Sequence, residues 1–244
     1  MTPKAQTGER TYYKVARPDG FDFYTGKTIN YRESIGRIVR VPTFESKDKP
    51  AICSPSVIHA SRQPIEALGY GKIPCALFRV EGKPVVEDTD KAGFKEFRVI
   101  EEIPEDSKGD YFGLKWDEAL HPFDPRKVSV ESVSEAHLSE LKTYASVRNS
   151  VRDSVWDSVW GSVWGSVRNS VRNSVWGSEA SYVGSLFTQI KEWKYTEKVK
   201  VEGYPFQSCV NLIKAGLVPA TDGRQWFLVG FKNEQPKVLW SGQP

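Results

Sequence analysis

Eight tetrapeptides follow one another without a break from Ser146 to Gly177. They read SVRN, SVRD, SVWD, SVWG, SVWG, SVRN, SVRN and SVWG, so the serine and the valine never change. The third position is only Trp or Arg, and the fourth is only Asn, Asp or Gly. Because a short exact period requires every unit to repeat one local geometry, this array constrains the fold more than any other feature of the chain.

Two backbone geometries accept a period of four. In an α-helix each tetrad turns the chain by about 400°, so the valine stripe moves around the helix by roughly 40° per tetrad. Ser, Val, Asn, Asp and Gly are also mediocre to poor helix formers. In a β-solenoid, valine would point inward, Ser and Trp/Arg outward, and Asn, Asp or Gly would form the corner. The pattern therefore predicts a short β-solenoid, with one long helix as the alternative and disorder as a third interpretation.

The third positions of the tetrads form the candidate binding surface. A three-sided solenoid would stack Arg148 on Trp160 and Arg172, which favours three sides over four through cation–π contacts. Trp and Arg dominate the energetics of protein interfaces, so this row indicates a partner-binding face. Packing of the rings against flanking domains, or copying slippage of a twelve-base unit without selection for a ligand, would also explain the array. The candidate binding residues are Arg148, Arg152, Trp156, Trp160, Trp164, Arg168, Arg172 and Trp176.

The composition is that of a globular protein. The 34 basic and 31 acidic side chains give a formal charge of +3, which provides no electrostatic reason to expect a nucleic-acid partner. Three widely spaced cysteines form neither a disulfide framework nor a paired metal motif, so we expect reduced thiols in the cytoplasm. No segment resembles a signal peptide or a membrane span, and we therefore expect a soluble protein.

The rest of the chain predicts an α+β fold around the array. Residues 1–104 read as a strand-rich domain with one short helix at Pro64–Leu68, capped by Ser61 and stopped by Gly69. Residues 105–133 read as an irregular linker, and Ser134 caps a helix over 134–145. Residues 178–244 read as a small α+β module with a helix from Pro205 to Gly216 and a hairpin. The expected strands are 12–16, 35–41, 51–53, 75–81, 94–100, 225–231 and 237–240.

Few residues outside the array suggest chemistry. Cys53 and His59 are a candidate nucleophile pair, but packing and hydrogen bonding is the favoured interpretation for them. The acidic residues Glu87, Asp88 and Asp90 are typical of a solvated turn, with a weak divalent-cation site as the alternative. The three histidines lie too far apart in sequence for a local metal motif.

Two parts of the sequence resemble a family of uncharacterised bacterial and phage proteins. The first is the N-terminal series YKVARPDGFDFYTG, ICSPSVIHAS, EALGYG and VEGKPVVEDTDK, similar to a domain of unknown function. The glycine that the family usually carries ahead of its histidine is Ser56 here. The second is the C-terminal pattern FQxxxxLxxxGLVPxxDGxxW, found in proteins with the same kind of SVxx array. The resemblance implies a shared lineage and no particular activity.

A looser similarity points to ADP-ribosyltransferases, which bind NAD. Arg17, His59, Tyr70 and Glu102 are the residues that this similarity would place in a catalytic site. No Glu-x-Glu motif accompanies these residues, and several of them fit the scheme of those enzymes poorly. We therefore expect a non-enzymatic binding or assembly protein without a cofactor, in which the array is a spacer, a self-association surface or a partner face. Its partner would be a protein or a second copy forming a homo-oligomer or filament. An NAD-dependent enzyme in the N-terminal domain is the alternative.

Overall fold

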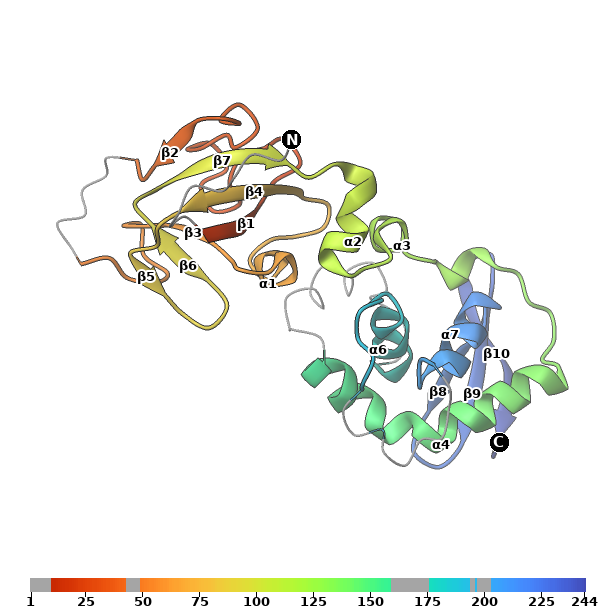
Figure 1. The fold of residues 1–244 in the computed structure, drawn as a ribbon. Coiled ribbons are helices and arrows are strands. Elements are labelled where there is room, and N and C mark those ends of the chain that lie inside the picture. The colour runs from red at the N-terminus through yellow and green to blue at the C-terminus, as the bar shows by residue number, and fades with distance from the viewer. Residues whose placement is uncertain (1–9, 43–48, 159–175, 194–195, 197–202) are drawn as a thin grey trace, which may run out of the picture. The chain divides into compact units, whose positions relative to one another are not determined.

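The backbone is described for residues 10–42, 49–158, 176–193, 196 and 203–244 in a computed structural model, with the side chains of 149–158 and 176–177 outside that description. The chain divides into two compact units, residues 1–113 and 114–244. Helices and strands occur in both units, which confirms the α+β class. Figure 1 shows the elements of each unit.

The N-terminal unit contains a four-stranded antiparallel sheet. In strand β4 (Ala76–Gly82), Ala76, Phe78 and Val80 belong to the hydrophobic core, and the intervening Arg79 and Glu81 are less buried. The period of two is what the CALFRVE segment predicts for a strand, although Leu77 on the opposite face is fully buried as well. In spatial order the strands are β1 (Arg10–Ala16), β4 (Ala76–Gly82), β7 (Glu96–Glu102) and β2 (Ile38–Arg40).

A second, three-stranded sheet lies against the same core. Its order is β3 (Ile58–Ala60), β6 (Ala92–Phe94) and β5 (Val86–Glu87), and His59 pairs with Gly93. A Cβ atom on Gly93 would lie 2.8 Å from the side chains of both Val57 and Val86, so only glycine allows this close approach. Ile58, Ala60 and Phe94 join residues of the first sheet in one hydrophobic core.

Most local predictions for this unit are confirmed, and three need correction. Helix α1 spans Pro64–Leu68 and ends at Gly69, as predicted. Its N-cap is Gln63 rather than Ser61, and the Glu66 carboxylate accepts a hydrogen bond from the Gln63 N–H at 3.0 Å. Of the predicted strand 35–41, the part that forms a strand is β2, Ile38–Arg40. Residues 51–53 form a turn rather than a strand, because Cys53 has a left-handed backbone with φ of 62°.

The segment 105–133, expected as an irregular linker, contains four short helices. The first two lie at the end of the N-terminal unit, and the division between the units follows Gly113. Gly113 has φ of 65° and caps the second helix with a left-handed residue, which is a common helix stop. The four helices are η1 (Glu105–Ser107), α2 (Lys108–Phe112), α3 (Trp116–Leu120) and η2 (Pro125–Lys127).

Helix α4 (Glu135–Ser158) corrects the solenoid prediction for the beginning of the array. It starts at the predicted cap, where the Ser134 Oγ accepts the His137 N–H at 3.4 Å and the Ser134 N–H donates to His137 Nδ1 at 3.2 Å. The helix then continues through the first three tetrads, so the β-solenoid is wrong for residues 146–158. The last tetrad contributes Trp176 to helix α6 (Trp176–Gly184). Residues 159–175 lie outside the described part of the chain.

The C-terminal unit is built from α4, α6, α7 (Gln207–Lys214) and a three-stranded antiparallel sheet. The sheet order is β10 (Gln235–Gly242), β9 (Trp226–Lys232) and β8 (Val218–Thr221). Leu141 of α4, Leu212 of α7 and Leu228 of β9 share one core, so α4 and α7 cover a face of the sheet (Figure 1). Gly216 follows α7 with φ of 82°, and a Cβ atom on it would lie 2.8 Å from the Val128 side chain, which leaves room only for glycine.

Among the helices in the described part of the chain, none is both long enough and apolar enough to span a lipid bilayer.

Candidate functional site

The start of the tetrad array is part of the C-terminal core. Val147, in the first tetrad, is buried and lies one helical turn beyond the buried Tyr144. The guanidinium of Arg148 lies 5.5 Å from the centre of the Trp226 ring in β9, which is a cation–π distance. The Tyr144 ring meets the same Trp226 edge to face at 5.8 Å. The first Trp/Arg position of the array therefore contacts an aromatic residue of its own unit.

The residues that follow the array are fixed in the same unit. Ser178 is buried and its Oγ donates a 2.7 Å hydrogen bond to the Pro219 carbonyl oxygen in β8. The Tyr204 hydroxyl donates to the Ser181 carbonyl oxygen at 2.7 Å, next to the buried Cys209. Both ends of the array thus belong to residues 114–244.

The remaining predicted binding residues are only partly placed. Arg152 and Trp156 lie in α4 and Trp176 begins α6, where the backbone is described and the side chains are not. Trp160, Trp164, Arg168 and Arg172 lie outside the described residues. Arg148 is consequently the one predicted binding residue whose contacts can be given.

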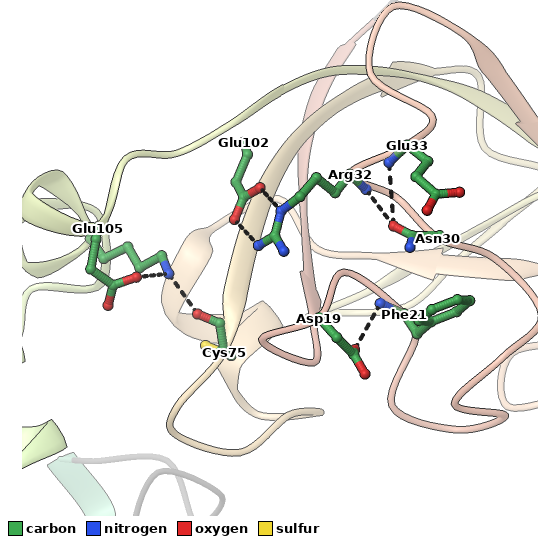
Figure 2. A network of polar contacts seen from close by, with 9 residues as sticks. Asp19, Phe21, Asn30, Arg32, Glu33, Cys75, Glu102 and Glu105 are labelled. Carbon is green, nitrogen blue, oxygen red and sulfur yellow. Dashed lines mark hydrogen bonds and ion pairs between the residues drawn. The ribbon is translucent and has the colours of Figure 1, made fainter.

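In the N-terminal unit, Arg17 and Glu102 belong to a charged network at one end of the larger sheet. The Arg32 guanidinium donates from Nε and Nη2 to the two Glu102 carboxylate oxygens, both at 2.6 Å (Figure 2). Arg17 Nη2 pairs with Asp19 at 2.8 Å, and Asp19 also accepts the Phe21 N–H at 3.2 Å. A bidentate ion pair of this kind fixes the Glu102 carboxylate against its neighbour.

A second group of polar side chains contains the other two residues of the ADP-ribosyltransferase similarity. We call it the Cys53 cluster; its members are Cys53, His59, Tyr70, Asp90 and Lys91. The Cys53 N–H donates to His59 Nε2 at 3.0 Å, and Lys91 Nζ donates to Cys53 Sγ at 2.8 Å. Lys91 Nζ also lies 4.3 Å from the centre of the Tyr70 ring, while the Tyr70 hydroxyl donates to Asp90. The four residues that the similarity groups are therefore divided between two networks.

The electrostatics of the Cys53 cluster keep His59 neutral. Burial, then the positive charges of Lys14 and Lys91, lowers the pKa of His59 from 6.5 to about 4. A neutral imidazole can accept the Cys53 N–H through Nε2, as observed. His59 thus contacts the main chain of Cys53 and supports the loop, in agreement with the favoured packing interpretation rather than with a nucleophile pair.

The acidic residues at the end of β5 and in the turn that follows it have different partners. Glu87 accepts from the Tyr12 hydroxyl at 2.9 Å and pairs with Arg62 at 3.1 Å. Asp90 is buried beneath Tyr70, and Asp88 accepts from the Thr89 N–H at 2.8 Å. Within the described residues no group of three or more His, Cys, Asp or Glu side chains could hold a metal ion.

Sequence reasoning did not identify Lys91 as a partner of Cys53. The two residues are 38 positions apart, and the pairing of β3 with β6 brings their segments together. The one signal in the sequence was the short distance along the chain between Cys53 and His59. The structure adds that Cys53 is exposed, whereas Cys75 and Cys209 are buried.

No protein-family model, curated protein or solved structure matches this chain.

Proposed function

We propose that this protein is a non-enzymatic binding or assembly protein, in which the Trp/Arg-bearing tetrads associate with a second copy of the chain. One observation carries the proposal: the residues at the two ends of the array are buried in the same unit. Val147 at the start and Ser178 just after the end are 4% and 1% exposed.

This anchoring favours a surface over a spacer. A spacer would separate two units, and its ends would belong to different ones. Here α4 and α6 both belong to residues 114–244, and Tyr144 of α4 lies among Ser178 and Ser181 of α6. The array is thus an insertion within one unit. Such an insertion supports a role as an interaction surface better than a role as a spacer.

The contact of Arg148 with Trp226 supports association of the tetrads through cation–π pairs. Arg and Trp are the two residues found at the third position of the tetrads, and the guanidinium of Arg148 lies over the Trp226 ring. Such a pair contributes about 0.5–2 kcal/mol, depending on how far water is excluded. Two arrays that present both residue types to each other can form the same pair many times.

A conservative exchange within the array tests the proposal. Trp156→Arg and Trp160→Arg together replace two rings by the residue that the array itself uses at this position. We expect the double variant to dissociate at a concentration at least roughly 30-fold higher than the unmodified chain, since even one buried tryptophan of an interface contributes about 2 kcal/mol. Light scattering over a concentration series measures the mass of both chains.

Two further chains complete the test. Removal of Ser154–Gly165, three whole tetrads, should weaken association as well. Lys142→Ala, on the exposed side of α4 outside the array, is the matched control and should leave the mass unchanged. Monomeric mass for the unmodified chain at all concentrations would overturn the proposal. So would saturable binding of NAD that is lost in Glu102→Ala, because it would support the enzyme instead.

A further inference from the structure

The Cys53 cluster places a thiol and an amine at reacting distance in an exposed position. We propose that Cys53 and Lys91 are a covalent modification site, at which peroxide converts the contact between them into a sulfur–nitrogen cross-link. The Lys91 Nζ and Cys53 Sγ atoms lie 2.8 Å apart. This inference concerns the N-terminal unit and is independent of the function proposed for the tetrads.

Lys91 is held in place by contacts other than the one with sulfur. Its Nζ lies over the Tyr70 ring at 4.3 Å, and the Tyr70 hydroxyl donates to the buried Asp90 next to Lys91 in the chain. The Lys91 carbonyl oxygen also accepts the Asp88 N–H at 2.8 Å, which closes the turn between β5 and β6. The amine therefore stays near Cys53 without depending on it.

Cys53 is equally fixed, and it is the accessible cysteine. The Cys53 N–H donates to His59 Nε2 at 3.0 Å. In the same loop the hydroxyls of Ser54 and Ser56 form a hydrogen bond with each other. The side chain is exposed, so a small oxidant can reach the sulfur. The distance of 2.8 Å between Cys53 Sγ and Lys91 Nζ keeps the amine beside the sulfur on which the oxidant acts. Burial raises the pKa of both Cys75 and Cys209 to about 12, so these two thiols stay protonated and provide internal controls.

The chemistry balances with hydrogen peroxide as the oxidant. The Cys53 thiol loses its proton and its sulfur attacks one peroxide oxygen. The O–O bond breaks and the departing hydroxide takes up a proton, so that a sulfenic acid and one water form. Lys91, after losing its proton to solvent, then attacks the sulfur. An S–N bond forms, the S–O bond breaks, and the hydroxyl leaves as a second water. In sum, one thiol, one amine and one peroxide give one sulfenamide and two waters, and a thiol reductant reverses the step.

The cross-link would join two segments that the fold already places together. It closes a loop of 38 positions between the segment before β3 and the turn before β6, two strands that are paired. The bond would consequently lock the smaller sheet of the N-terminal unit without requiring a rearrangement of its strands.

Peptide mass spectrometry of the full chain tests the inference. After treatment with one equivalent of hydrogen peroxide, cleavage after glutamate releases Cys53 in residues 46–66 and Lys91 in residues 88–96. We expect a linked pair whose mass is about 2 Da below the sum of the two peptides, since two hydrogens are lost. Dithiothreitol should return both peptides to their unmodified masses.

Three variants distinguish this reaction from ordinary oxidation. Lys91→Arg retains the positive charge beside the sulfur and should abolish the linked pair, leaving a sulfenic acid that a 1,3-diketone traps. Lys95→Arg, in the same released peptide, should keep the linked pair. Cys53→Ser should remove all product. An unlinked oxidised Cys53 in the unmodified chain, or a linked pair that survives Lys91→Arg, would overturn the proposal.

Discussion

His59 shows how one side chain in the N-terminal unit depends on its charge. Its Nε2 accepts the Cys53 N–H at 3.0 Å, which requires a neutral ring. Burial opposes protonation of the ring and lowers its pKa, and the positive charges of Lys14 and Lys91 lower it further. The loop that carries Cys53 is thus supported by an imidazole that must stay uncharged.

This arrangement predicts a loss of stability in mild acid. The pKa of His59 is about 4 in the folded chain and 6.5 ordinarily, so the unfolded state takes up the proton first as the pH falls. The contribution is complete above pH 6.5 and is lost toward pH 4. We expect His59 to cost about 1–2 kcal/mol of unfolding free energy between pH 7 and pH 4.5, allowing for its partial exposure. Urea unfolding across this range measures it.

His59→Gln is the matched variant for that measurement. A glutamine amide oxygen can accept the Cys53 N–H but does not titrate. As the pH falls from 7 to 4.5, the unmodified chain should therefore lose about 1–2 kcal/mol of unfolding free energy relative to His59→Gln. A constant difference from pH 7 to pH 4.5 would contradict the argument.

The residues of the candidate site differ in how far the sequence predicts them. Cys53 and His59 stand out in one short segment, and their supporting role follows from it. Lys91 does not stand out, because its meeting with Cys53 depends on the pairing of two strands that no local pattern indicates. The bidentate pair of Arg32 with Glu102 is 70 positions apart and depends on tertiary structure in the same way.

At the scale of elements, α4 explains why helix propensity failed as a guide to the array. The tetrads are poor helix formers, but the segment before them begins with a capped turn and contains Glu, Ala, Leu and Lys. Helix formation is costly to start and cheap to extend, so the tetrads continue a helix that they would not begin. Leu141, Tyr144 and Val147 then bury one face of that helix.

Two adjacent residues of the first tetrad, Ser146 and Val147, should differ in how much their substitution destabilises the C-terminal unit. Val147→Ala should lower the unfolding free energy of the C-terminal unit by about 2 kcal/mol, because a buried side chain leaves a cavity. Ser146→Ala should change the same free energy by less than about 0.5 kcal/mol, since Ser146 is exposed and its hydroxyl donates to the Thr143 carbonyl oxygen of its own helix. Equal effects of the two substitutions in thermal unfolding would contradict the packing of the first tetrad.

Strand β8 was missed for a clear physical reason. Pro219 interrupts the segment Val218–Thr221, and proline argues against a central strand. The sheet order places β8 at an edge, where proline is tolerated. Strands β9 and β10 were predicted because their apolar runs follow strong turn residues, whereas edge position cannot be recognised from one sequence.

At the scale of the whole molecule, each unit has its own hydrophobic core. Phe78 belongs to the core of residues 1–113, and Leu228 belongs to that of residues 114–244. Both side chains are fully buried. Truncation of either should cost about 3–5 kcal/mol in its own unit.

Hydrogen exchange of the full chain tests this division. We expect Leu228→Ala to speed amide exchange in α4, α7 and β9 and to leave β1, β4 and β7 unchanged. Phe78→Ala should produce the reverse pattern. Faster exchange throughout the chain in either variant would show a single cooperative core and would contradict the division after Gly113.

The packing of α4 on the sheet of its own chain has a consequence for association between two chains. Each chain carries both the helix and the surface that receives it, with Arg148 above Trp226 and Leu141 against Leu212 and Leu228. Two chains can therefore swap α4 reciprocally and recover every one of these contacts, at the cost of opening the connections on either side. Crowded or partly denatured samples are the conditions under which such intertwined dimers should accumulate.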